Sequence, residues 1–464
     1  MIHKRDRTSD EPAPHPHDTP AKHGKFRRAI HENIWLNLAI GVAFTVVMWG
    51  LATWVEKKQF YAGIMAREFV YDLIQHHLSA SAPSDPGVVV VVVAGHWKSA
   101  QTGRLYSSDQ PQDPYDFTDR AFLQKLVMAI ADLQPKSIGL DIDFTPYPMQ
   151  LDDDDRFLAC SLARSSGSQF GRTFLPANNF DPSCIAADPK RVPIYVAAYT
   201  SIVHGPIFAL ARPEYSMLAA FAGAVKPGQN EAPRKMVYSI EVPYGYQGGQ
   251  SWWVNSLSTA LHGDRADAPA PAFSWAAERL PVARNYNFMA TEFYVDYGPI
   301  ENIARSTIPA DDLTDSSKVA QHTGQIRDRF VLIGRDSPLD QHTVPGRYDR
   351  TFSGVFVHGC SVYTLSAGKL LALLLPKGRL ILDICLFLVI IAIVEFTRWI
   401  RNRFFGAETP TGIVHLVTTV FVVILAVIGG IYLSSYFRIL WDDSLFVGVA
   451  LIAHSIVDHV ITGV

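Results

Sequence analysis

The sequence lacks a dominant charge, an ordered set of metal ligands and a cleavable leader. Its 41 Lys and Arg nearly balance 44 Asp and Glu, and no basic stripe interleaved with aromatic residues occurs, so nucleic-acid binding is not indicated. The acidic run Asp152–Asp155 lacks the alternate spacing and glycine turn of a calcium loop. Residues 1–34 contain histidines at no fixed spacing, which favours a disordered cytoplasmic leader. We therefore expect neither a bound metal nor a cofactor.

Long apolar segments are present, and about 20 apolar residues suffice to cross a bilayer. Four segments of this kind occur: Trp35–Trp54, Leu380–Phe396, Gly412–Leu433 and, more weakly, Ser444–Val464. No small-residue cleavage pattern follows the first, so it is predicted to stay in the protein as a span. The sequence thus predicts an integral membrane protein with one transmembrane helix at 35–54 and three within 379–464.

The positions of Lys and Arg predict the orientation of these helices, because cytoplasmic connectors carry an excess of them. Seven basic residues precede the first segment, and Arg398, Arg401 and Arg403 follow the second. The connector after the third segment holds only Arg438. Both termini are therefore expected in the cytoplasm, with residues 55–378 forming one large extracytoplasmic domain.

The cysteines fit an oxidising compartment outside the cytoplasm. Cys160 and Cys184 both fall in the predicted external domain. A disulfide between them would close a loop of about 25 residues and stabilise the domain by roughly 3 kcal/mol. Two free thiols that never meet remain the alternative.

The external domain has the sequence pattern of an α/β fold with a mostly parallel central sheet. Gly87–Ala94 and Ser137–Leu140 are short apolar runs that predict buried strands, and a helix capped by Thr118 or Asp119 is expected between them. This order is typical of a parallel βαβ unit. Further strands are expected at 192–198, 292–297 and 329–333, and helices at 60–78, 251–262 and 354–375. Residues 95–117 and 335–352 are expected to be irregular.

Two carboxylates, Asp141 and Asp143, follow the strand at 137–140. Open α/β sheets bind their ligands at the carboxyl ends of the strands, so these acids are candidates for a ligand crevice. Asp340, His342, Thr343 and His358, which follow the strand at 329–333, are further ligand-binding candidates. The alternative for each is a structural hydrogen bond that closes a loop or caps a helix.

Several ordered features resemble the CHASE group of extracellular sensor domains, second type, found on bacterial transmembrane transducers. They are the segment FTDRAFLQKLVMAIADLQPKSIGLDIDF at 117–144, the acids at 152–155, the turn Tyr297–Gly298–Pro299, and RFVLIGRDSPLDQHTVPGRYDRTFSGVFVHG at 329–359. The resemblance covers nearly the whole chain and implies a sensor in a bacterial inner membrane, facing the periplasm, with one span before the domain and three after it.

Members of this group usually carry a cytoplasmic output module after the last span, and this sequence ends at that point. The resemblance implies the sensory role, whereas this departure from the family pattern leads us to expect no enzymatic activity. The protein would recognise an external small molecule or protein and pass a signal through its helices to a separate membrane or cytoplasmic protein. A structural or accessory subunit of a larger membrane complex is the first alternative.

A magnesium-dependent phosphatase is the second alternative. Asp141, Asp143 and Thr145 fit the DxDxT signature of the haloacid dehalogenase phosphatases, in which the first Asp attacks phosphorus. Asp336 and Asp340 would then be the acidic pair that holds magnesium. Phe144 replaces the glycine usual after the second Asp.

Overall fold

The computed structural model describes residues 42–43, 45–47, 49–51, 53–54, 61–80, 82–113, 116–142, 158, 192–199, 219–222, 234–242, 252–263, 277–278, 282–285, 288–338, 340–404 and 411–441. The chain forms two compact units. One comprises Met1–Ala52, Leu380–Ala426 and Phe446–Val464, and the other comprises Thr53–Arg379 and Val427–Leu445. Asp143, Thr145, Cys160, Cys184 and the run at 152–155 lie outside the described residues, so the predictions made for them stay predictions.

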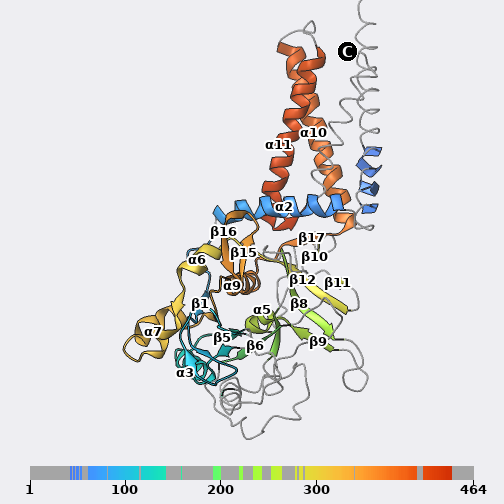
Figure 1. Cartoon of the computed structure of the whole chain (residues 1–464). Helices are drawn as coiled ribbons and strands as arrows, with labels where there is room; N and C mark the ends of the chain where they lie inside the picture. The colour runs from blue at the N-terminus through green and yellow to red at the C-terminus, as the bar shows by residue number, and fades with distance from the viewer. Residues whose placement is uncertain are drawn as a thin grey trace, which may run out of the picture. The chain divides into compact units, whose positions relative to one another are not determined.

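The larger unit is organised on a six-stranded sheet with the order β13-β1-β14-β5-β6-β7 (Figure 1). All five pairings between neighbouring strands are parallel. The strands are β1 (Val88–Val92), β5 (Ser137–Asp141), β6 (Ile194–Tyr199), β7 (Ala219–Ala222), β13 (Ile308–Pro309) and β14 (Phe330–Gly334). The predicted α/β fold with a mostly parallel sheet is confirmed.

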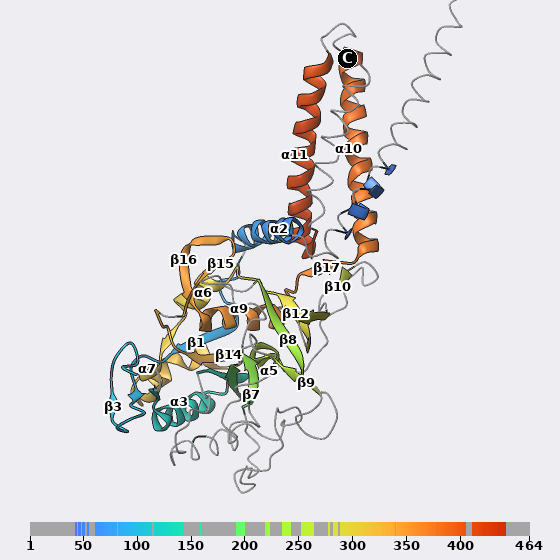
Figure 2. The same cartoon turned by 45° about the vertical axis from the view of Figure 1, so that its right-hand side comes forward.

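Helices cover both faces of this sheet, which explains why β1 is apolar at every position. Val89 and Val91 pack with α3 (Arg120–Asp132), whereas Val88 and Val90 pack with α9 (Gly354–Ser366). The side chain of Asp119 accepts a hydrogen bond from the backbone N–H of Phe122 at 3.2 Å, so Asp119 caps α3. Figure 2 shows α3 and α9 on different sides of the strands.

The remaining elements of the larger unit form smaller sheets and short helices around this core. Among the described residues, the sheets are β3-β2-β4, β11-β12-β8-β9, β15-β16 and β10-β17-β18. Their strands are β2 (Trp97–Lys98), β3 (Leu105–Tyr106), β4 (Phe117–Thr118), β8 (Lys235–Val242), β9 (Trp252–Asn255), β10 (Ala277–Glu278), β11 (Val282–Asn285), β12 (Phe288–Tyr294), β15 (Gln341–Val344), β16 (Arg347–Ser353), β17 (Ala372–Leu374) and β18 (Ile439–Leu440). The helices are α2 (Tyr61–Ala80), α5 (Leu257–His262), α6 (Ile300–Arg305), α7 (Ala310–Thr314), η4 (Val319–His322) and α8 (Thr323–Ile326).

Two regions expected to be irregular contain strands. Residues 95–117 hold β2, β3 and the start of β4, and residues 335–352 form the β15-β16 hairpin. These strands are stabilised by hydrogen bonds to their partner strands. The weak strand propensity of their own residues does not predict such pairing. The helix predicted at 60–78 is confirmed as α2.

Two predicted helices are shorter than expected. The segment 251–262 begins as β9, because its Trp and Val residues favour a strand, and Ser256 then caps α5. The helix predicted at 354–375 ends at Ser366, and Gly368 adopts φ 62°, a conformation that ends helices. Residues 372–374 form β17 instead.

Two long helices, α10 (Pro376–Phe404) and α11 (Thr411–Phe437), cover the second and third predicted spans. Within the described part of the chain, one helix, at Val420–Phe437, is long and apolar enough to cross a membrane. It exposes large apolar side chains, among them Phe421, Ile428 and Tyr436, as a lipid-facing helix does. The predicted total of four spans is not confirmed, since the first segment is described in part and the whole of the last one, 444–464, lies outside the described residues.

Candidate functional site

The candidate site lies at the carboxyl ends of β1, β14 and β5, which are adjacent in the sheet. The register pairs Val92 with Gly334 and Gly334 with Asp141, so these three residues mark one edge. Gly334 leaves room for α9, because a Cβ at this position would lie 2.6 Å from Cγ2 of Val355. The start of α9 therefore packs directly against the carboxyl ends of these strands.

Asp141 and His358 come together at this edge. The Oδ1 atom of Asp141 lies 3.8 Å from Nε2 of His358, and the two side chains are 6% and 12% exposed. Nδ1 of His358 is buried and has no hydrogen-bond partner within the described part of the chain. The sequence named both residues, and the structure shows that they form one acid–imidazole pair.

Asp340 and His342 form a second pair, at the start of α9. Oδ1 of Asp340 lies 2.8 Å from Nε2 of His342, and Oδ2 accepts a hydrogen bond from the backbone N–H of Gly354 at 3.0 Å. The Asp340 carboxylate therefore satisfies the amino end of α9, as a capping residue does. Thr343, the other candidate from this segment, stands opposite Thr351 in the hairpin.

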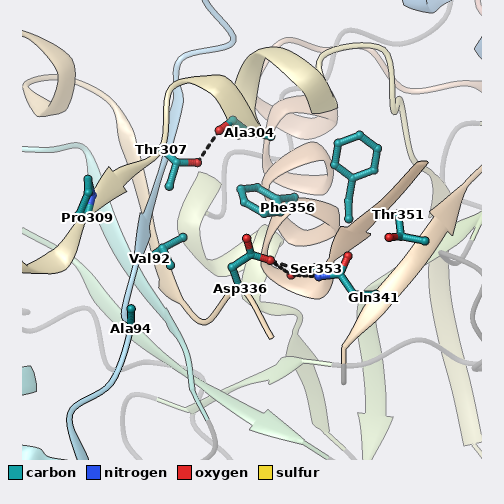
Figure 3. Close-up of a pocket in the computed structure, with 11 residues that line it drawn as sticks. Val92, Ala94, Ala304, Thr307, Pro309, Asp336, Gln341, Thr351, Ser353 and Phe356 are labelled. Carbon is teal, nitrogen blue, oxygen red and sulfur yellow. Dashed lines mark hydrogen bonds between the residues drawn. The ribbon is translucent and has the colours of Figure 1, made fainter. Parts of the chain in front are cut away.

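A cavity of about 510 Å³ lies between the end of β1, α6 and the hairpin (Figure 3), and none of Asp141, His358, Asp340 and His342 lines it. Its volume falls in the range that holds small-molecule ligands. The residues that line it are Val92, Ala94, Ala304, Thr307, Pro309, Asp336, Gln341, Thr351, Phe352, Ser353 and Phe356. The sequence pointed to this strand edge but missed most of these residues, because the hairpin that supplies several of them was not foreseen.

Asp336 is the charged side chain of the cavity wall, and it belongs to a hydrogen-bonded network. The hydroxyl of Ser353 donates to Oδ1 of Asp336. Nε2 of Gln341 donates to the same oxygen at 3.2 Å and to Oγ of Ser353 at 2.7 Å. These contacts fix the position of the Asp336 side chain in the wall.

Arg335, the residue before Asp336, does not line the cavity. Its guanidinium lies 3.5 Å from the ring centroid of Trp97 and donates to the backbone oxygen of Gly95 at 2.9 Å and to Oγ1 of Thr118 at 3.0 Å. Burial lowers the pKa of Arg335 to about 10, opposed by Tyr106 and aided by Arg120. The positive charge is therefore fixed against the β2-β4 sheet.

A parallel sheet with a cavity at the carboxyl ends of its strands is the arrangement in which α/β domains usually bind ligands. The chain belongs to the CHASE2 domain family, whose model matches residues 39–393. CHASE2 domains are extracellular sensor domains, so this is a membrane protein with an extracytoplasmic sensor domain. Comparison with curated proteins and with solved structures gives no match.

The phosphatase alternative is neither supported nor tested by this arrangement. Asp336 and Asp340 are each held by hydrogen bonds to the hairpin or to α9. Within the described residues, no group of three His, Cys, Asp or Glu side chains could hold a metal ion. The absence of enzymatic activity stays a prediction.

Proposed function

We propose that this protein is a membrane-anchored extracytoplasmic sensor. A ligand at the carboxyl edge of the sheet acts through α9 on the segments that lead into the membrane, and a separate membrane or cytoplasmic protein receives the signal. The family supports the sensor role, and the contacts of α9 support this route.

Helix α9 joins the candidate site to the far side of the domain. Phe356 in its first turn lines the cavity, and His358 faces Asp141. Near its other end, Oγ1 of Thr364 accepts a hydrogen bond from the backbone N–H of Asp296 at 2.8 Å. A packed helix is stiff, so a displacement at its first turn carries to Thr364.

The observation that carries the proposal is the ion pair between Asp296 and Arg438. Nη1 of Arg438, the residue after α11, lies 2.6 Å from Oδ2 of Asp296. Nη1 of Arg438 also donates to the backbone oxygen of Lys369 at 3.2 Å, and the backbone N–H of Ala372 donates to the oxygen of Arg438 at 2.8 Å. The segment after α11 is thereby fixed to the residues that the end of α9 holds.

Helix α2, which follows the first predicted span, forms hydrogen bonds with residues 295–297, on either side of Asp296. The hydroxyl of Tyr71 donates to the backbone oxygen of Val295 at 2.6 Å. Oε1 of Gln75 accepts from the backbone N–H of Tyr297 at 2.8 Å. Residues 295–297 are thus held by α2, α9 and Arg438 together, and they form the point at which a signal passes to segments adjoining predicted spans.

The same contacts support the proposed four-span topology with cytoplasmic termini. Residues 427–445 belong to the unit that contains the sensor domain, which supports a carboxyl end of α11 on the same side of the membrane as that domain. A spanning α11 then begins in the cytoplasm, next to the Arg-rich end of α10. A green fluorescent protein inserted after Phe404 should fluoresce, and alkaline phosphatase at that position should be inactive. The reverse result contradicts this topology.

Hydrogen exchange of the full-length protein in nanodiscs tests the signalling route. Ala304→Phe places a ring in the cavity and stands in for a ligand, and Ala320→Phe adds the same ring at an exposed position outside it. We expect A304F to change amide exchange at 294–298 and 436–441, and A320F to leave both unchanged. The change at 436–441 should disappear when Arg438→Gln is added.

An A304F protein that alters exchange around the cavity but not at 436–441 overturns the proposed route.

Purification in mild detergent distinguishes the accessory-subunit alternative from the sensor. A stoichiometric complex whose exchange is indifferent to cavity filling supports a structural role, whereas a partner whose binding changes with A304F supports sensing.

A further inference from the structure

We infer that the cavity takes a small organic ammonium: a ligand with a protonated amine, which binds Asp336, and an apolar body, which packs on the aromatic wall. This inference rests on the proposed sensor role and names the ligand class of that same site.

The hydrogen-bond donors of the cavity wall are almost all used within the protein. The Ser353 hydroxyl donates to Asp336, and the Gln341 amide nitrogen donates to Asp336, Ser353 and the backbone oxygen of Ser337. The Thr307 hydroxyl donates to the backbone oxygen of Ala304 at 2.7 Å. In the described part of the chain, the remaining side-chain donor of the wall is the hydroxyl of Thr351.

Acceptors, in contrast, are left over. Both hydrogen bonds to Asp336 end on Oδ1, and Figure 3 shows its other oxygen directed away from Ser353, toward the space between Thr307 and Phe356. Oε1 of Gln341 accepts no hydrogen bond from the described residues. A lining with spare acceptors and few donors selects a ligand rich in donors, and an ammonium offers three N–H groups and no acceptor.

Charge points the same way. The residues that line the cavity include one carboxylate and no Lys, Arg or His. Among the described residues, no cationic side chain forms an ion pair with Asp336. The adjacent Arg335 is held by Trp97, Gly95 and Thr118, so it does not neutralise the site. An anion would meet the Asp336 charge without a compensating cation.

The other walls are apolar and fit the body of such a ligand. Phe352, Phe356, Val92 and Pro309 supply two rings and two aliphatic surfaces. A lone metal ion would leave these surfaces unused and would find a single carboxylate. The combination of one anionic acceptor with apolar walls is that of a site for an amine with a hydrocarbon body.

Calorimetric titration of the full-length protein in detergent, with empty micelles as the blank, tests the inference. The probes are benzylamine, benzyl alcohol and benzoate, which share a ring and differ in charge. We expect benzylamine to bind about three- to fivefold more tightly than benzyl alcohol, because it pairs with the Asp336 carboxylate, which is exposed and so partly screened by water, and we expect benzoate not to bind.

Two variants test whether the preference for benzylamine depends on Asp336. Asp336→Asn keeps the shape and the Oδ1 acceptor and should abolish the preference for benzylamine. Asp349→Asn removes an exposed carboxylate of the same hairpin, outside the cavity, and should keep it. Equal affinity for the three probes, tighter binding of benzoate, no binding of benzylamine, or a benzylamine preference that survives in D336N overturns the inference. The comparison of probes on the unaltered protein needs no variant to fold.

The two proposals fail separately. Benzylamine that binds through Asp336 without changing amide exchange at 436–441 retains the ligand class and contradicts the signalling route. If A304F changes this exchange but benzylamine does not bind, the signalling route is retained and the ligand class is contradicted.

Discussion

Arg438 and Asp296, 142 positions apart in the sequence, form an ion pair with Nη1 and Oδ2 2.6 Å apart. The Asp296 side chain is 3% exposed and that of Arg438 is 20% exposed. Oδ1 of Asp296 accepts from the backbone N–H of Gly298 at 2.9 Å, so both carboxylate oxygens are used. The turn Tyr297–Gly298–Pro299, noted in the sequence, is thus fixed by the residue that follows α11.

Arg438→Gln should destabilise the sensor domain. The substitution leaves a buried carboxylate without its cation, and we expect a loss of about 2–3 kcal/mol in the free energy of unfolding, below the cost of a fully buried pair. Chemical unfolding in detergent measures it. Arg350→Gln, whose side chain is 62% exposed, serves as the control and should cost less than about 1 kcal/mol. Asp296→Asn combined with R438Q should cost less than R438Q alone, and a larger loss in the double variant contradicts the pairing.

Asp116 should contribute to acid sensitivity. Burial raises the pKa of Asp116, but hydrogen bonds from the Tyr106 hydroxyl and the backbone N–H groups of Ala100 and Asp113 outweigh it and lower the pKa below its usual value. The unfolded chain therefore binds a proton at a higher pH than the folded domain. The stabilisation is complete above the unfolded pKa and is lost as the pH falls through the folded pKa.

Unfolding curves of wild type and Asp116→Asn, measured between pH 7 and pH 3, check this expectation. The difference between the two proteins should shrink as the pH falls below about 4. Gln110→Asn, a change between two neutral residues at an exposed position of the same loop, serves as the control and should show a difference from wild type that does not change with pH. A gap for D116N that does not change with pH would show that its hydrogen bonds do not depend on ionisation.

Gly354→Ala should disrupt the start of α9. A Cβ at this position meets Oδ2 of Asp340, the atom that accepts from the Gly354 N–H. We expect a cost of about 1–3 kcal/mol in unfolding free energy. Asp340→Ala removes both the cap and the clash, so G354A should cost at least about 1 kcal/mol less in that background. If the losses of stability caused by G354A and D340A simply add in the double variant, the predicted contact between the added Cβ at position 354 and Asp340 does not exist.

Asp141 distinguishes a binding site from a phosphoryl-transfer site. We expect the full-length protein to hydrolyse no p-nitrophenyl phosphate above the blank with magnesium present, because the Asp141 carboxylate faces the imidazole of His358. Magnesium-dependent hydrolysis that Asp141→Asn abolishes and Asp340→Asn weakens would instead establish the phosphatase alternative.

Hydrophobic pattern was sufficient to predict the central strands. The β-branched run at 87–94 and the short apolar runs at 137–140 and 329–333 are too short for helices, and all three are strands. Their acidic ends indicated the ligand edge, since parallel strands place their carboxyl ends together. The partners of individual residues could not be predicted, because the pairs Asp141–His358 and Asp296–Arg438 depend on how distant segments pack.

The hairpin at 341–353 is the clearest example of a structure that could not be predicted from the sequence. Its exposed strand RYDRTFS is rich in charge and has no local pattern that separates it from a loop, yet pairing with β15 makes it a cavity wall. The sequence by itself determined the parallel core and the family, because each depends on composition and order along the chain. Only the tertiary structure decided that Asp336 is the charged group of the cavity and that Arg438 joins the end of α11 to the sensor core, because each requires residues brought together by folding.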